Sequence, residues 1–202
     1  MTGIGRQAMK KLSVVIAIGV TVAILFAATA ALSSDKAAGN LSKMFYEKWA
    51  GYEIRYPSGW VMEKPDKVTV LFAGPSGTDD YYTTVTVQNV ASAKFGGKHQ
   101  NVQSLISDLK AQFTNSDPGT KFFNEKTFAF TSEKGTPVNA ITFGVTYTLQ
   151  GEKLQQWAVI IPRASDLVYH VFFYTSPARL YERNIKTAYD MLGTLKLLEG
   201  SK

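Results

Sequence analysis

Residues 167–174 (LVYHVFFY) constrain the fold of this chain more than any other stretch. Almost every side chain in the segment is apolar or aromatic, so both faces of an extended strand are apolar. Such a strand is typical of the centre of a sheet that is covered on both sides, because exposing either face to water would be unfavourable. The rest of the chain must therefore supply a covering layer for each face.

Several other segments show the two-residue period of half-buried strands. In residues 139–149, Ile141, Phe143 and Val145 share one side, and a Gln150-Gly151-Glu152 turn leads into a strand at 154–161. Residues 122–130 alternate imperfectly. Upstream, strands are expected at 44–49, 51–56, 67–73 and 81–90, with the last two joined as a hairpin across the Asp79-Asp80 turn. These short connections predict an antiparallel sheet.

Two segments show helical periodicity instead. The first has Val102, Leu105 and Ile106 at the start of one apolar stripe that continues to Phe113, and Asn101 is positioned to cap it. The second is expected to begin with Ser176 as the N-cap and Pro177 at the first helical position. Its stripe includes Tyr181, Ile185, Ala188, Tyr189 and Leu192, and Gly193 closes it. The sequence predicts an α+β fold, an antiparallel β-sheet flanked by helices on both faces.

Residues 51–60 combine a strand with a sharp stop. Tyr52, Ile54 and Tyr56 alternate with polar residues, Pro57 removes a backbone donor, and Ser58-Gly59 permits a tight turn. The large side chain that follows, Trp60, is predicted to be largely buried. A hairpin, an inserted helix and a late strand pair come after this motif. The pattern over roughly residues 43–198 resembles the PsbP-like family. Two motifs carry the resemblance, Tyr52-x-Ile54-x-Tyr56-Pro57-x-Gly59-Trp60 and Ser176-Pro-Ala-Arg-Leu-Tyr.

That family includes the extrinsic subunit of the photosynthetic oxygen-evolving complex and bacterial DcrB-related envelope proteins. The resemblance implies a PsbP-like α/β/α sandwich that serves as a non-enzymatic accessory module of membrane-associated complexes. The shared motif is structural, so the resemblance carries over no catalytic residue. Some photosynthetic members bind metal through His and acidic groups, and no such ligand set matches this sequence.

The N-terminal segment predicts export. Arg6, Lys10 and Lys11 precede residues 12–32, which carry no charge. That run reaches the length of about 20 residues that a membrane span needs. Ala28-Thr29-Ala30, however, also suits signal-peptidase cleavage before Ala31. We therefore expect residues 1–32 to be a signal peptide or an N-terminal membrane anchor, 33–42 a linker, and 43–202 a single domain. The domain would be periplasmic, either free or anchored in the inner membrane.

Charge and cysteine content exclude several functions. The chain has 22 basic and 16 acidic side chains, and without the three basic residues of the N-terminus 19 remain against the 16. This balance is too mild to indicate nucleic-acid binding. The chain has no cysteine and two histidines. Disulfides, thiolate nucleophiles and cysteine-zinc sites are therefore excluded, and little material remains for metal or general-base chemistry.

No motif in the sequence predicts a catalytic site, a bound cofactor or a bound metal. A P-loop, a dinucleotide fingerprint and an HExxH helix are all missing, and the turn around Ser76 lacks the spacing of a nucleophile elbow. Asp79 and Asp80 are the only adjacent carboxylates. They would hold a cation only with further oxygen ligands, and a solvated turn is the favoured interpretation. His170 is expected to be a hydrogen-bonded core residue, and His99 to lie in a mobile loop.

Aromatic residues offer the best prediction of a binding surface, because Trp and Tyr are frequent interface anchors. We predict a partner surface at Trp49, Tyr52, Tyr81 and Tyr82. The predicted function is a non-catalytic exported accessory domain of the bacterial cell envelope that binds a protein partner. The N-terminal segment would attach it to the membrane if uncleaved. The alternative is a periplasmic small-ligand binder or hydrolase whose site the sequence does not reveal.

Overall fold

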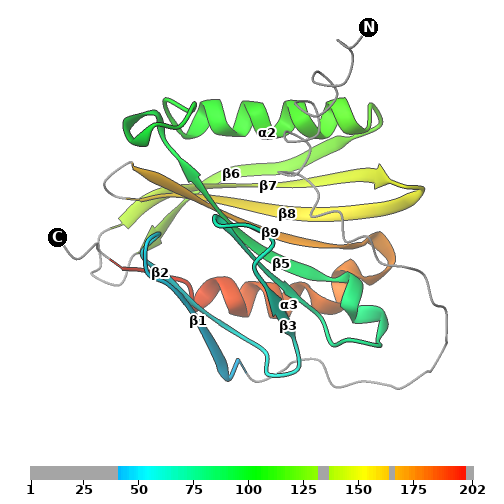
Figure 1. Ribbon diagram of the computed structural model, residues 1–202. Coiled ribbons are helices and arrows are strands. Elements are labelled where there is room, and N and C mark those ends of the chain that lie inside the picture. The colour runs from blue at the N-terminus through cyan, green and yellow to red at the C-terminus, as the bar shows by residue number, and fades with distance from the viewer. Residues whose placement is uncertain (1–40, 132–136, 164–166, 199–202) are drawn as a thin grey trace, which may run out of the picture.

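The computed structural model describes residues 41–131, 137–163 and 167–198 (Figure 1). Residues 1–32, predicted as a signal peptide or anchor, lie outside the described residues, as does most of the 33–42 linker. Within the described ranges, the helices are too short or too polar to cross a bilayer.

A seven-stranded sheet forms the centre of the fold, in the order β3-β4-β5-β9-β8-β7-β6. Every neighbouring pair in it is antiparallel, which confirms the predicted α+β class with an antiparallel sheet. Its strands are β3 (Val61–Glu63), β4 (Thr69–Ala73), β5 (Thr84–Ala91), β6 (Lys121–Thr131), β7 (Pro137–Leu149), β8 (Glu152–Pro162) and β9 (Val168–Pro177).

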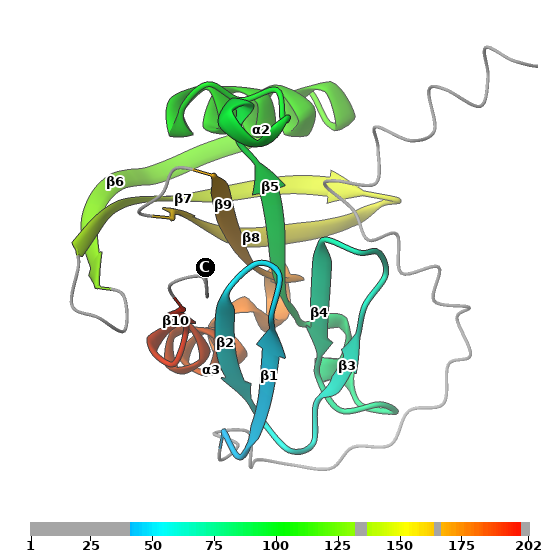
Figure 2. The same cartoon turned by 60° about the vertical axis from the view of Figure 1, so that its left-hand side comes forward.

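Strand β9 is central and buried on both faces, as its apolar sequence predicts. Tyr169, Val171 and Phe173 belong to the hydrophobic cluster that includes helix α2 (Val102–Ser116). Phe172 and Tyr174 point the other way, into a second cluster that includes helix α3 (Tyr181–Gly193). The two helices lie on opposite sides of the central strands in Figure 2.

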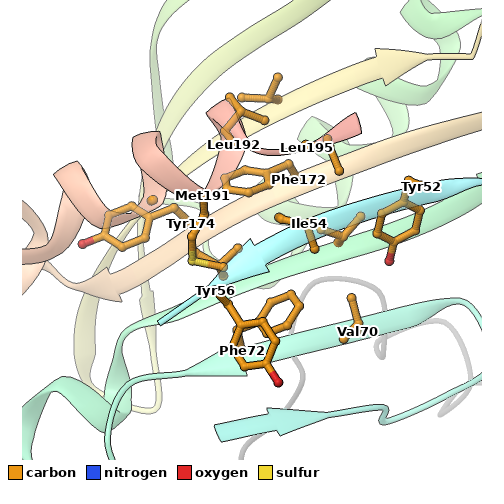
Figure 3. Close-up of a cluster of buried hydrophobic side chains, with 14 of the residues drawn as sticks. Tyr52, Ile54, Tyr56, Val70, Phe72, Phe172, Tyr174, Met191, Leu192 and Leu195 are labelled. Atoms are coloured by element: carbon orange, nitrogen blue, oxygen red, sulfur yellow. The ribbon is translucent and has the colours of Figure 1, made fainter. Parts of the chain in front are cut away.

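A second, three-stranded sheet shares the side of the main sheet on which α3 lies (Figure 2). It has the order β1-β2-β10 and consists of β1 (Lys43–Glu47), β2 (Tyr52–Tyr56) and β10 (Lys196–Leu197). Tyr52, Ile54 and Tyr56 of β2 are buried in the cluster shown in Figure 3, where the Tyr56 and Phe72 ring centroids lie 4.7 Å apart. Trp60 is buried in the same cluster, as predicted. The sequence did not predict this separate sheet.

Helix α2 begins and faces the sheet as its sequence predicts. The Asn101 side-chain oxygen accepts a hydrogen bond from the Ser104 backbone N–H at 2.9 Å, and Ser104 Oγ accepts one from the Asn101 N–H at 3.3 Å. This reciprocal pair satisfies two backbone donors that the first helical turn leaves free. Leu105, Ile106, Leu109 and Phe113 are the buried side chains of the helix.

The predicted start of the second helix is wrong. Ser176 and Pro177 are the last residues of β9, and a 3₁₀ turn, η4 (Ala178–Leu180), separates them from α3. Ser176 remains extended because it pairs with Gln155 of β8 and its hydroxyl hydrogen-bonds the Thr83 hydroxyl at 2.9 Å. These sheet contacts outweigh the local tendency of Ser-Pro to begin a helix.

Candidate functional site

The structure removes Tyr52 from the predicted partner surface. Its side chain is 0% exposed, and its ring centroid lies 5.3 Å from that of His170 and 6.1 Å from that of Phe45. Tyr52 occupies the inward-facing register of β2 together with Ile54 and Tyr56, so it forms part of the core. The prediction that Tyr52 contacts a partner is wrong.

The other predicted residues do not form one surface. Trp49 is 47% exposed in the turn between β1 and β2, Tyr82 is exposed, and Tyr81 is half-buried beside it, with ring centroids 6.3 Å apart. Tyr82 lies just before β5, at the end of the β5–β9 pair where Thr84 is paired with Thr175. The turn that contains Trp49 leads into Tyr52, and Tyr52 contacts His170, which lies near the other end of that pair. Trp49 and the Tyr81–Tyr82 pair therefore lie toward opposite ends of these strands.

Asp79 and Asp80 belong to a 3₁₀ turn, η2 (Asp79–Tyr82), and face different partners. Asp80 is buried, its Oδ1 accepts a hydrogen bond from Asn184 Nδ2 at 2.8 Å, and Arg183 Nε lies 3.6 Å from the same oxygen. Asp79 is exposed, with Oδ2 3.7 Å from Arg179 Nη1. In the described part of the chain, no three His, Asp or Glu side chains converge as metal ligands would. The interpretation of a solvated turn is wrong for Asp80, which fastens η2 to α3.

We expect Asp80→Ala to lower the free energy of unfolding by about 1–3 kcal/mol, because it leaves the buried Asn184 amide without its acceptor. Asp79→Ala is the matched control, and its exposed ion pair should contribute less than about 1 kcal/mol. Urea denaturation of the two variants measures the difference. Equal losses for both would contradict the structural role of Asp80.

His170 is a buried core residue, as predicted. Its Nδ1 lies 2.8 Å from the Asn89 side-chain oxygen, whereas Nε2 has no hydrogen-bond partner among the described residues. Burial, with a smaller contribution from the positive charge of Arg163, lowers the pKa of His170 to about 3. The imidazole is therefore neutral at physiological pH. It is also 0% exposed beneath Tyr52, so a substrate cannot reach it in this conformation.

His99, predicted in a mobile loop, is instead buried and bonded. Its carbonyl accepts a hydrogen bond from the Ala93 N–H at 2.8 Å, and the backbone of His99 forms an isolated parallel β-bridge with that of Ser92. Burial and the nearby Lys98 ammonium lower the pKa of His99, although Asp108 acts in the opposite direction. Asp108 lies 3.9 Å from His99 Nε2 and 2.8 Å from Lys98 Nζ. Both histidines are thus buried, and the contacts described for each are with residues of the fold.

A group of exposed and half-buried aromatic residues lies on α3 and on the strands beside it. The ring centroids of Trp157 and Tyr189 are 4.4 Å apart, and Trp157 Nε1 donates a hydrogen bond to Thr142 Oγ1 at 2.6 Å. Tyr189 is 54% exposed, although its helical stripe predicted a core position. Phe128 and Phe130 of β6 are half-buried against the same cluster as Trp157. We call these four residues the α3-side aromatic surface.

A second exposed surface lies on the small sheet. Met44 and Tyr46 of β1 point away from the core, on the same side of the sheet as Arg55 of β2, and the exposed Lys48 and Trp49 form the adjoining turn. We call these five residues the outer hairpin face. Only Trp49 among them was predicted as a partner residue. The sequence of β1 could have indicated this face, because Phe45 and Glu47 alternate with Met44 and Tyr46 and occupy the inward register.

Comparison with known proteins identifies the fold. No protein-family model matches the sequence, and a search of the curated proteins found no match. Among solved structures, the cyanobacterial PsbP protein CyanoP from Synechocystis sp. PCC 6803 is similar, with a TM-score of 0.52 and 15% sequence identity. The match covers 82% of this chain and 98% of CyanoP.

The Ran-binding protein Mog1p of Saccharomyces cerevisiae is similar to the same degree. Its TM-score is 0.52 at 10% sequence identity, and the match covers 78% of this chain and 95% of Mog1p. The predicted PsbP-like fold is therefore confirmed as a PsbP/Mog1-like fold. Sequence identities this low show a shared fold and leave function to be argued from the surfaces of this chain.

Proposed function

We propose that this chain is a non-catalytic, exported accessory domain of the bacterial cell envelope that binds a protein partner through the α3-side aromatic surface. The observation that carries the proposal is the Trp157–Tyr189 pair. Tyr189 is largely exposed but its ring packs on Trp157, which is in turn held by Thr142. Tyr and Trp anchors that are already ordered lose little side-chain entropy on binding, and these residue types are enriched among interface hot spots.

Three further observations support the parts of this proposal. The only two imidazoles of the chain are both buried against structural partners, which favours binding over hydrolysis. The basic start and uncharged run at 12–32 support export and a place in the envelope. The fold is shared with Mog1p, whose name records binding to Ran, so this scaffold is compatible with protein binding. A relation to DcrB-related proteins remains part of the proposal.

The test places a photoreactive phenylalanine analogue at Tyr189 in the full chain, within the envelope of its native host. We expect a crosslink to one protein, and none from the same analogue at Phe95, an equally exposed aromatic residue just after β5. Tyr189→Ala should reduce recovery of that protein about tenfold, since hot-spot truncations cost more than 1 kcal/mol. Phe95→Ala should leave recovery unchanged.

Phe95→Ala alters an exposed side chain and should change the stability by less than about 0.5 kcal/mol. Tyr189→Ala also loses the ring contact with Trp157, so it should cost about 0.5–1.5 kcal/mol, which leaves the domain folded. Loss of binding would then report on the surface and not on folding. Equal recovery of the partner with Tyr189→Ala and Phe95→Ala, or no crosslink from position 189, would contradict the proposed binding surface.

A further inference from the structure

We infer that the outer hairpin face lies against an anionic lipid membrane, with Met44, Tyr46 and Trp49 at the level of the lipid headgroups. The inference rests on the proposed place in the envelope and on retention of residues 12–32 as a membrane anchor, which is one of the two outcomes predicted for that segment. It concerns a different surface from the one proposed for the protein partner.

The β1–β2 hairpin has an outer side with exposed side chains and an inner side with buried ones. Met44 pairs with Arg55 and Tyr46 with Glu53 across the β1–β2 ladder, so these residues share the outer side. Phe45 occupies the other side and packs against the core. Because the inner side of the hairpin is packed on the main sheet, the outer side remains available for contact with a partner.

The exposed residues of this hairpin have the chemistry of a membrane interface. Met44 and Tyr46 are more than half exposed, and Trp49 nearly so, within six consecutive residues that also include Lys48. Trp and Tyr concentrate at the headgroup level because their rings are apolar and each carries one polar group. Lysine stems extend along such a surface while the ammonium group reaches the phosphates.

The charges of the hairpin favour an anionic surface. Its two carboxylates are each paired with a lysine from outside the hairpin, Glu47 with Lys64 at 2.5 Å and Glu53 with Lys196 at 3.1 Å. Those pairs leave Lys48 and Arg55 of the outer hairpin face as a net positive charge on the turn and β2. Basic residues near an anionic membrane surface strengthen binding to it.

The position of the apolar run in the sequence argues for lipid as the occupant. Ten residues, 33–42, separate the end of the run at 12–32 from Lys43, the first residue of β1. A chain of that length spans at most about 35 Å, so a retained anchor holds β1 within that distance of the bilayer. Such tethering raises the local concentration of lipid at the hairpin, and weak individual contacts then suffice for stable docking.

The test uses the absence of cysteine, which makes a single introduced thiol the only labelling site. The full chain carrying Tyr46→Cys, labelled with an environment-sensitive fluorophore, is reconstituted into phosphatidylcholine vesicles containing 30% phosphatidylglycerol. Tyr189→Cys is the matched control, since Tyr46 and Tyr189 are 52% and 54% exposed. We expect acrylamide to quench the label at 46 at least threefold less than the label at 189. This protection should weaken in pure phosphatidylcholine and after Lys48→Glu with Arg55→Glu.

Vesicle flotation separates the two ways in which the inference can fail. A chain that floats but shows equal quenching at positions 46 and 189 overturns the docking and leaves the anchor intact. A chain that does not float overturns both the anchor and the docking. Protection at position 46 that occurs in native envelopes but not in lipid vesicles assigns the face to a protein and overturns the lipid assignment.

Discussion

Replacement of Tyr52 by alanine is expected to lower the free energy of unfolding by about 3–5 kcal/mol, as truncation of a buried aromatic side chain usually does. Tyr52 is 0% exposed and connects the small sheet to the main one through its contacts with Phe45 and His170. Truncation would leave a cavity between the sheets. Urea denaturation of the domain measures the effect.

Two controls separate this packing effect from other roles of a tyrosine. Burial raises the pKa of the Tyr52 phenol, so its hydroxyl stays neutral and Tyr52→Phe should change stability by less than about 1.5 kcal/mol. Tyr46→Ala, on the exposed side of β1, should change it by about 0.5 kcal/mol or less. A loss in Tyr52→Phe as large as that in Tyr52→Ala would contradict the account based on packing.

The second large effect is expected on acid stability. Burial and Arg163 lower the pKa of His170 to about 3 in the folded protein, against about 6.5 in an unfolded chain. Between these values the unfolded state binds more protons, so protonation favours unfolding. The stabilising contribution of neutral His170 is therefore complete above pH 6.5 and is lost as the pH falls toward 3.

From pH 7 to pH 4.5, the wild-type protein should lose about 2 kcal/mol more stability than His170→Gln, because glutamine does not titrate. Glutamine can still hydrogen-bond Asn89, the partner of His170 Nδ1. His99 is present in both proteins, so its titration cancels in the comparison. Parallel stability curves for the two proteins over this pH range would contradict a buried neutral His170.

Local periodicity explains why much of the fold could be predicted. Apolar residues on both faces of 167–174 indicated the central strand β9, and the spacing after Asn101 indicated α2 and its cap. These features follow from stereochemistry within a few residues along the chain. The alternation of Tyr52, Ile54 and Tyr56 also indicated their common buried side. The same alternation places Tyr52 in the core, which is why its prediction as a binding residue is wrong.

Other errors have a common physical cause, since each depends on a contact between distant residues. Ser176 stays in a strand because Thr83 and Gln155 lie beside it, although Ser-Pro favours a helix start. Asp80 is buried because Asn184, 104 residues later, supplies a donor for its carboxylate. Tyr189 is exposed, and its ring packs on Trp157 of β8, 32 residues earlier in the chain. No local pattern contains these partners.

The amino-acid sequence thus specified strands, caps and the choice of antiparallel pairing, because periodicity and turn chemistry act over short distances. It also excluded cysteine chemistry outright. Tertiary packing decided which aromatic residues reach the surface. It also paired β2 with β10, and beside this pair the Arg55 N–H donates a hydrogen bond to Thr194 Oγ1, 139 residues later in the chain. Both exposed surfaces of this protein, the α3-side aromatic surface and the outer hairpin face, arise from that packing, since only the docking of distant elements determines which side of a strand or helix remains uncovered.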